Sequence, residues 1–313
     1  SRRQRQMCIR DRFDMAVAGS TNAVLHILSY AYELGIKLTL ADFEKYAKEI
    51  PCINAVVPSG PYTVVDFHYA GGVMNVMKML ESKLYTDVPS MYGNTWADML
   101  SRVKAQENKV IHSLEKPLFN EPGLKILRGN LSPNGAIVRP TAVYDEVKYM
   151  KGKAKVFEGD RPAFEAIMAG EIVPGDIIVI RYEGCKGAPG MKELMLSIDA
   201  LIGLGLDKSV GLISDARFSG FNYGAIIGHV SPEAYDGGNI ALVENDDEIV
   251  IDIPNGEVSM LVSEEELERR RAAWVCPPLK EEKGCLNIFA KMCRPAEEGG
   301  AMQPWDLDAK FHR

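Results

Sequence analysis

Apolar residues recur at helical spacing through residues 19–108. The motif GSTN at residues 19–22 supplies side chains that cap a helix, and apolar residues then follow every three or four positions over residues 23–34, until Gly35 ends the run. We therefore predict that this part of the chain is mostly helical with short connectors. The further segments with this pattern are TLADFEKYAKEI, which has Thr39 and Asp42 as a possible cap, PSGPYTVVDFHYAGGVMNVMKMLESK and TWADMLSRVKAQ.

From about Asn120 the pattern changes to short β-branched runs that glycine and proline interrupt. A nearly continuous apolar run over residues 176–181 is typical of a strand covered on both faces, and residues 209–214 form a second buried strand. The segment DEIVIDIPNGEVSMLVS predicts a hairpin around Pro-Asn-Gly, and Ser263 with Glu266 predicts a capping box on the following helix. Strands and helices together predict an α/β fold.

These changes of pattern divide the chain into four parts. We place a boundary near residue 118, between a helical part (14–118) and a strand-rich part (119–275). Residues 276–313 are rich in proline and glycine, and we expect them to lie on the surface. Residues 1–13 are rich in arginine and lack an apolar period, so we interpret them as a non-native segment outside the fold.

Composition and charge narrow the possible functions. Hydrophobic residues make up 46% of the chain and charged residues 25%, which is ordinary for a globular protein. The net charge of -7 gives no electrostatic support for a nucleic-acid partner. The sequence has no apolar run of about 18 residues, so we predict no membrane span. The six cysteines contain no CxxC pair, so a reduced, cytoplasmic setting is expected, and their spacing alone predicts no cluster or zinc site.

The first candidate for chemistry is Glu193, at the end of the segment RYEGCKGAPGMKEL. Here a predicted strand runs into a glycine-rich loop and then into a predicted helix, whose first turn would contain Glu193. One interpretation is a glutamate that the helix dipole favours at this position. The other is a hard oxygen ligand for Mg²⁺, which binds one or two carboxylates together with substrate oxygens.

The second candidate is Ser219 in SDARFSGFNYG, directly after the other buried strand. If the two buried strands are parallel neighbours, both loops open at their carboxyl ends, where α/β sheets usually bind ligands. The segment is not a GxSxG elbow, and no Ser-His-Asp order is present, so Ser219 is either a turn cap or a base. A serine can act as a base where a nearby cation stabilises its alkoxide.

Several of these segments resemble, in the correct order, the dihydroxy-acid dehydratase and phosphogluconate dehydratase family. The resemblance runs from about Asp14 to about Met292. The matching strings include GSTNAVLH, PSGPYTVVDFHYAGGV, LRGNLSPNGAIV, GDIIVIRYEGCKGAPGMKEL, ISDARFSG and GHVSPEAYDGG.

The resemblance implies a hydro-lyase that converts a 2,3-dihydroxy acid into a 2-keto acid, as in branched-chain amino acid biosynthesis (isoleucine and valine). It implies an iron–sulfur cluster, usually [2Fe–2S], and a Mg²⁺ ion. The serine of the family's D-[AG]-R-F-S-G motif, the base that removes the C2 proton, falls on Ser219. The glutamate of its P-G-M-x-E motif, a Mg²⁺ ligand, falls on Glu193.

For the fold, the resemblance implies that residues 14–118 are the C-terminal part of a large α/β cluster-binding domain. Residues 119–275 would be a smaller, β-barrel-like (swivelling β/α) domain, with the site between domains of a homodimer or larger homo-oligomer. The family's cluster cysteines and its other Mg²⁺ ligands lie upstream of GSTN, and none of the six cysteines here matches them. Cys185 stands where the family often has proline, and Ala18 replaces a glycine.

We therefore expect this chain to be about the second half of such an enzyme and to be inactive alone. Two alternatives stay open. One is a sugar-acid (aldonate) dehydratase of the same family, which would act on a different small-molecule substrate. The other is a non-catalytic module, although such a module would need neither Ser219 nor Glu193.

Overall fold

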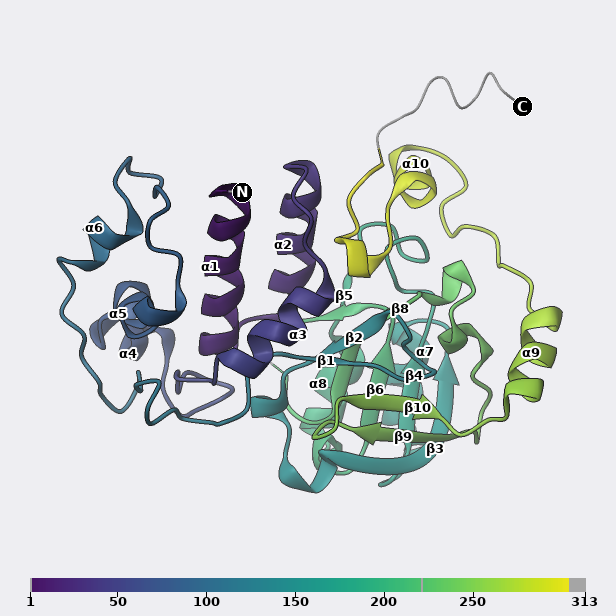
Figure 1. The fold of residues 1–313 in the computed structure, drawn as a ribbon. Helices are drawn as coiled ribbons and strands as arrows, with labels where there is room; N and C mark the ends of the chain where they lie inside the picture. The colour runs from purple at the N-terminus through teal and green to yellow at the C-terminus, as the bar shows by residue number, and fades with distance from the viewer. Residues whose placement is uncertain (1, 221, 304–313) are drawn as a thin grey trace, which may run out of the picture.

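The computed structural model describes residues 2–220 and 222–303, and the side chains from residue 8 onward. Helices of the first hundred residues lie to one side of a mixed, nearly closed eight-stranded sheet (Figure 1). This arrangement confirms the α/β class. None of the helices in the described part of the chain is a candidate membrane span.

The helical part follows the sequence pattern closely. Ser20 caps the second helix by accepting a hydrogen bond from the backbone of Asn22, and Thr39 forms a capping box with Asp42, as predicted. The predicted apolar helix after residue 62 is divided in two, because Gly71 has a φ of 102° and cannot continue a right-handed helix. The helices are α1 (Arg2–Val17), α2 (Thr21–Glu33), α3 (Leu40–Glu49), α4 (Val64–Tyr69), α5 (Gly72–Met79) and α6 (Trp96–Leu100).

The expectation that residues 1–13 lie outside the fold is wrong for their second half, because α1 includes them. Cys8 and Ile9 are buried, and the Cys8 thiol lies 2.8 Å from the Tyr46 hydroxyl. The Arg12 guanidinium lies over the Tyr46 ring, which explains how an arginine-rich segment packs here. Whether residues 1–13 are native is a separate question, and their non-native origin stays a prediction.

The sheet combines parallel and antiparallel pairs in the order β1-β2-β8-β6-β4-β3-β9-β10. The pairs β3–β4, β4–β6 and β6–β8 are parallel, and the other pairs are antiparallel. The sheet nearly closes because Arg128, just after β1, bridges to Glu257 on β10. Its strands are β1 (Lys125–Leu127), β2 (Gly135–Val138), β3 (Tyr149–Phe157), β4 (Ile177–Ile180), β6 (Gly211–Ser214), β8 (Ile226–Ser231), β9 (Glu248–Asp252) and β10 (Glu257–Met260).

Strands β4 and β6 are buried on both faces, as their continuous apolar sequences predict. Val179 and Ile213 point into a core to which all eight strands contribute. Ile178 and Leu212 point the other way, into a second core beneath α7 (Asp160–Met168) and α8 (Leu196–Gly203). The two strands that lead to the candidate residues are therefore held from both sides.

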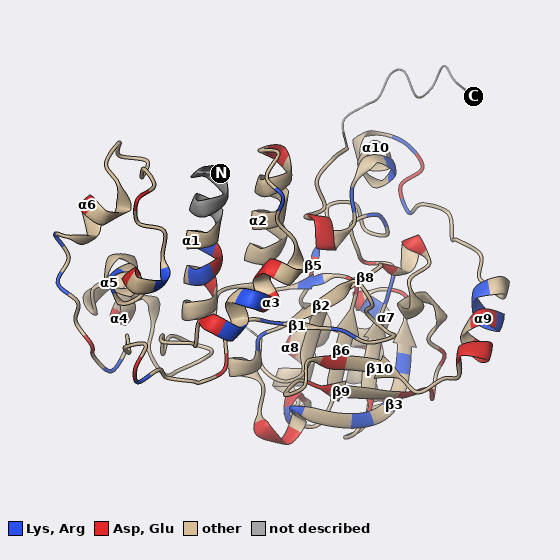
Figure 2. Cartoon of the chain, in the orientation of Figure 1, with Lys and Arg blue, Asp and Glu red and all other residues tan. Residues whose placement is uncertain are grey.

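The C-terminal region confirms one prediction and corrects two. β9 and β10 form the predicted hairpin. On α9 (Glu264–Ala273), acidic residues begin the helix and basic residues end it (Figure 2). Ser263 caps this helix, but Glu266 pairs with Arg269 and Arg270 instead of closing the capping box.

The segment expected to lie on the surface after residue 275 is partly buried. It contains α10 (Cys285–Met292), and Cys293 and Ala296 pack against Leu25, Cys185 and Met191. These contacts join the tail both to α2 and to the loop after β4. The division near residue 118 stays a prediction; the last helix of the helical part ends at Leu100, and the first strand begins at Lys125.

Candidate functional site

The loops after β4 and β6 lie side by side, as the sequence predicts. The strands are parallel, with Ile180 opposite Ser214, so their carboxyl ends share one edge of the sheet. The fully buried carboxylate of Asp215 accepts hydrogen bonds from the backbone N–H groups of Tyr182 (3.1 Å), Glu183 (3.0 Å) and Ala234 (2.9 Å). One aspartate therefore fixes three loops at this edge.

Glu193 does not lie in the first turn of a helix, so that prediction is wrong. It belongs to a two-residue strand, β5 (Glu193–Leu194), which pairs in parallel with β7 (Arg217–Phe218). The helix begins later because Asp160 accepts hydrogen bonds from the first N–H groups of α8, including that of Leu196 at 3.1 Å. The pairing places Glu193 opposite Arg217, two residues from Ser219.

Asn22 joins the two candidate segments. Its side-chain amide donates hydrogen bonds to the Glu193 carboxylate and to the backbone carbonyl of Phe218, the latter at 3.2 Å. Ser219, which is half-buried, follows Phe218 directly. A Cβ atom added to Gly220 would lie 3.4 Å from the Cβ of Ser20, so this turn passes close to the start of α2.

Three sequence motifs therefore meet at one place, which we call the motif junction: residues 19–22, Glu193 and residues 217–220. The sequence pattern around Asn22 predicts only a helix cap, and the contact with Glu193 was not predicted. Its membership in GSTN, one of the strings that carry the family resemblance, was the available signal.

A small cavity of about 170 Å³ adjoins the motif junction. Arg217 reaches into it, donates a hydrogen bond to the Met191 carbonyl and lies 3.4 Å from the His26 ring nitrogen Nε2. His229 is buried nearby, and burial together with the charge of Arg217 lowers its pKa to about 3, which keeps it neutral. Arg217 thus provides a permanent positive charge within the motif junction, on the side that faces this cavity.

Two buried carboxyl groups near these loops have raised pKa values. Burial raises the pKa of Asp215 to about 6, although the N–H donors oppose the shift. Burial, followed by the charge of Asp215, raises the pKa of Glu233 to about 8. Glu233 also accepts hydrogen bonds from the backbone N–H groups of Lys186 and Gly187 in the loop after β4. The carboxyl groups of Asp215 and Glu233 therefore both hold these loops in place.

The junction provides hard oxygen donors but only part of a magnesium site. Glu193 supplies a carboxylate, and the buried Asn22 Oδ1 has no hydrogen-bond partner in the part of the chain that the structure describes. Within residues 2–220 and 222–303, no three His, Cys, Asp or Glu side chains are grouped so that they could hold a metal. Glu193 therefore fits the role of one Mg²⁺ ligand, with the other ligands still to be supplied.

An iron–sulfur cluster does not fit the described residues. All six cysteines are free thiols. Cys276 and Cys285 are exposed and the other four are buried, and of these only Cys185 and Cys293 share one buried cluster. Burial raises the pKa of Cys52 to about 11 and that of Cys293 to about 12, whereas cluster ligands are thiolates. We derive no step of the reaction from a cluster bound by these cysteines.

Sequence comparisons identify the family. A family model described as Dihydroxy-acid/6-phosphogluconate dehydratase C-terminal matches residues 109–300, and its N-terminal counterpart matches residues 11–99. The chain belongs to the dihydroxy-acid/6-phosphogluconate dehydratase family. This confirms the resemblance, and the two matched regions contain all three motifs of the junction.

The chain is also similar to curated proteins named dihydroxy-acid dehydratase. It is 45% identical to the one from Clostridium novyi over 293 residues, which cover 93% of this chain and 53% of the relative. It is 44% identical to those of Pyrobaculum neutrophilum (92% of this chain, 52% of the relative) and Geobacter sulfurreducens (94% and 54%). The chain thus spans about half the length of the curated relatives it matches.

Proposed function

We propose that this chain forms part of the active site of a dihydroxy-acid dehydratase, a hydro-lyase that removes water from a 2,3-dihydroxy acid and leaves a 2-keto acid. The observation that carries the proposal is the motif junction, where Asn22 bonds both to Glu193 and to Phe218, the last residue of β7 and the one before Ser219. The names of the relatives support the same reaction and a small-molecule substrate.

Within this proposal, the residues of the junction have distinct roles. Ser219 accepts the proton from C2 of the substrate, and Glu193 provides one oxygen ligand to Mg²⁺. When bound, the cation would stabilise the alkoxide of Ser219 and the oxygens of the substrate. Asn22 orients the Glu193 carboxylate and holds the Phe218 carbonyl, so that the two strands keep their register.

The other parts of the site would come from outside the described residues. A [2Fe–2S] cluster is typical of the family. We propose that none of the six cysteines of this chain is a ligand of that cluster. We accordingly expect the isolated chain to be inactive. The assay is keto-acid release from 2,3-dihydroxyisovalerate by the chain after reconstitution with iron, sulfide and Mg²⁺; turnover would contradict this part of the proposal.

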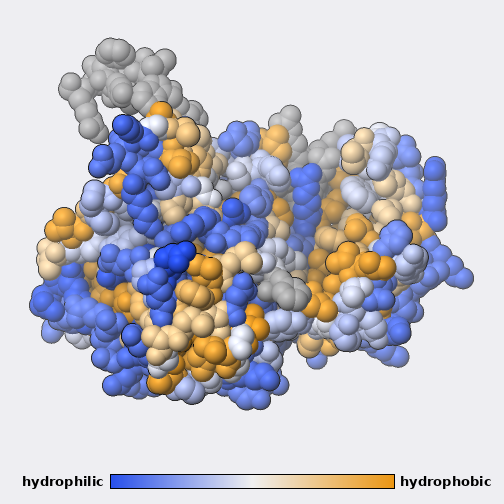
Figure 3. Space-filling model, turned by 180° about the vertical axis from the view of Figure 1, so that it is seen from behind, coloured by the Kyte–Doolittle hydropathy of each residue, from blue (hydrophilic) through white to orange (hydrophobic). Residues whose placement is uncertain are grey.

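Exposed apolar residues on α4 and α5 support association with further protein, as in the homodimer or larger homo-oligomer we propose. Val64, Val65 and Tyr69 are exposed by 71%, 63% and 83%, and no residue of α4 is buried. In the view from behind, apolar side chains gather on the side of the molecule that the helical part of the chain forms (Figure 3). Exposed apolar patches of this kind commonly mark interfaces. We further propose a cytoplasmic location, which is consistent with the free thiols of the six cysteines.

A sugar-acid (aldonate) dehydratase is the second candidate, because the matching family description includes 6-phosphogluconate dehydratases. The experiment that separates the two uses a fused enzyme, in which this chain replaces the matching half of the Clostridium novyi relative. We expect keto-acid formation from 2,3-dihydroxyisovalerate to exceed that from each member of a panel of aldonates. A preference for an aldonate would favour the second candidate, and no turnover with any substrate would favour a non-catalytic module.

A further inference from the structure

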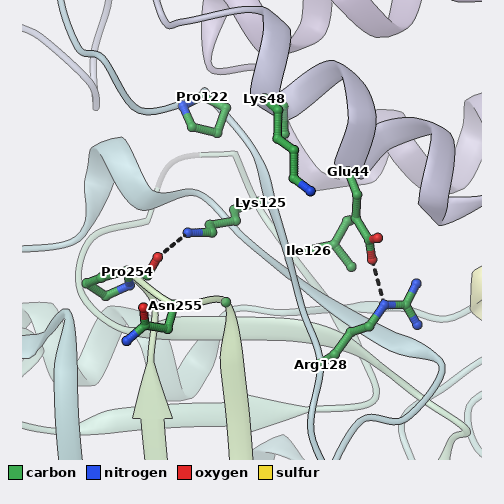
Figure 4. Close-up of a pocket in the computed structure, with 10 residues that line it drawn as sticks. Glu44, Lys48, Pro122, Lys125, Ile126, Arg128, Pro254 and Asn255 are labelled. Atoms are coloured by element: carbon green, nitrogen blue, oxygen red, sulfur yellow. Dashed lines mark hydrogen bonds and ion pairs between the residues drawn. The ribbon is translucent and has the colours of Figure 1, made fainter.

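A cavity of about 480 Å³ lies between α3 and the end of the sheet where β1 meets β10 (Figure 4). Its walls come from α3, from residues 122–128 around β1, and from the turn at residues 254–256 between β9 and β10. Small-molecule sites are usually about 300–1,000 Å³, so the cavity is large enough for a metabolite. No residue of the motif junction lines it.

The charge of this cavity is opposite to that of the whole chain. Lys48, Lys125 and Arg128 line it, whereas Glu44 is its one lining carboxylate, so three cations less one anion leave an excess of two positive charges. The chain as a whole has a net charge of -7. Lys48 belongs to α3, and Lys125 and Arg128 belong to β1 and the residue after it; Lys125 is directed to Pro254 and Arg128 to Glu44, on opposite sides of the cavity (Figure 4). A local positive field of this kind attracts small anions.

Hydrogen bonds hold two of the cations in place without using all their donors. The Lys125 ammonium donates to the Pro254 carbonyl at 2.7 Å, which uses one of its three N–H groups. Arg128 donates through Nε to Glu44 at 2.6 Å and through Nη1 to the Pro133 carbonyl at 3.1 Å. Among the residues that the structure describes, none accepts a hydrogen bond from Arg128 Nη2.

Partial burial adds a reason for an anion to bind here. Loss of water around its ammonium lowers the pKa of Lys125, although the charges of Glu121 and Asp252 act in the opposite direction. A bound carboxylate or phosphate would replace the lost solvation of this cation. The apolar side chains of Ala47, Pro122 and Ile126 complete the lining and can contact the carbon part of a ligand.

We propose that this cavity is a binding site for a small organic anion, whose carboxylate or phosphate groups pair with the cations that line it, Lys48, Lys125 and Arg128. The site is separate from the motif junction, and the inference does not depend on the proposed dehydratase activity. Because Arg128 also bonds through its backbone to the Gly256 carbonyl at 2.8 Å, the anion would connect α3 to the closing edge of the sheet. Binding should therefore stabilise the folded chain.

The test is calorimetric titration of the 313-residue chain at low ionic strength with succinate and with glycerol 3-phosphate, and with glycerol as the neutral probe. We expect saturable binding of at least one anion, no binding of glycerol, and a higher thermal midpoint at saturation. The anion that binds more tightly identifies the head group. Lys125→Gln and Lys48→Gln should each weaken binding about tenfold, and Lys125→Arg should retain it.

Lys104→Gln is the matched control, because it removes the same charge from an exposed position that does not line the cavity. It should leave the affinity unchanged within about twofold, as expected for a distant surface charge. Absence of saturable binding by both anions would overturn the proposal. Equal weakening by Lys104→Gln and Lys125→Gln would also overturn it, because that result means general attraction to a positive surface.

Discussion

The contact between Asn22 and Glu193 can be measured directly with a double-mutant cycle in the isolated chain. Asn22→Ala removes a hydrogen bond to a carboxylate, worth about 1.5–3 kcal/mol, and one to the Phe218 carbonyl, worth about 1 kcal/mol. It also removes the buried Asn22 Oδ1, which has no partner among the described residues, and this regains about 1 kcal/mol. The expected net loss in the free energy of unfolding is about 2 kcal/mol.

The second arm of the cycle is Glu193→Ala, and the third is the double variant. Because the first hydrogen bond exists only when both side chains are present, we expect a coupling energy of about 1.5 kcal/mol from urea unfolding monitored by circular dichroism. Asn94→Ala, at an exposed turn, is the matched control and should not couple to Glu193→Ala. A coupling energy below about 0.3 kcal/mol for the Asn22 cycle would refute the reasoning that the two motifs meet.

Two further predictions concern the loops around the junction. Gly224→Ala should lower the free energy of unfolding by about 3 kcal/mol in calorimetry, because φ at Gly224 is 88° and the new Cβ would lie 2.3 Å from the Asp207 carbonyl oxygen. The control Gly170→Ala should lower it by only about 1 kcal/mol, because φ at Gly170 is 75° but no atom lies within 4 Å of the new Cβ. Equal losses for the two variants would contradict the steric argument. Burial raises the pKa of Asp215 to about 6 and that of Glu233 to about 8, so the folded state binds more protons than the unfolded state. These two groups therefore stabilise the fold fully below about pH 4, and this contribution is lost as the pH rises to about 8. Glu233→Gln removes the ionisable carboxyl group but keeps a side-chain oxygen that can accept hydrogen bonds. The urea concentration at the midpoint of unfolding should therefore fall less between pH 5 and 8 for this variant than for the wild type. An equal or steeper fall would contradict the raised pKa of Glu233.

Features that depend on neighbouring residues were predictable from the sequence. The caps of α2 and α3 follow from side chains within three residues of each helix start. The burial of β4 and β6 follows from their continuous apolar runs, and their parallel pairing places Ser219 at the carboxyl edge, as expected. Local pattern is informative here because propensity and burial act in the same direction.

Features that depend on distant partners were not predictable. Glu193 lies in a strand because its segment pairs with β7, and α8 begins late because Asp160 caps it. Asn22 and Glu193 are 171 positions apart, so spacing along the chain cannot reveal their contact. The burial of Cys8 likewise depends on Tyr46, and the arginines around Cys8 gave a misleading signal.

The role of Ser219 as the base can be measured as the rate of the fused enzyme that carries Ser219→Ala. We predict that keto-acid formation from 2,3-dihydroxyisovalerate falls at least about 1,000-fold, since the group that accepts the C2 proton is lost. We also predict that substrate affinity and the midpoint of unfolding stay close to those of the unsubstituted fused enzyme, because one hydroxyl is removed from a half-buried position. If the Ser219→Ala enzyme keeps its rate within about tenfold, Ser219 is a turn residue and not the base.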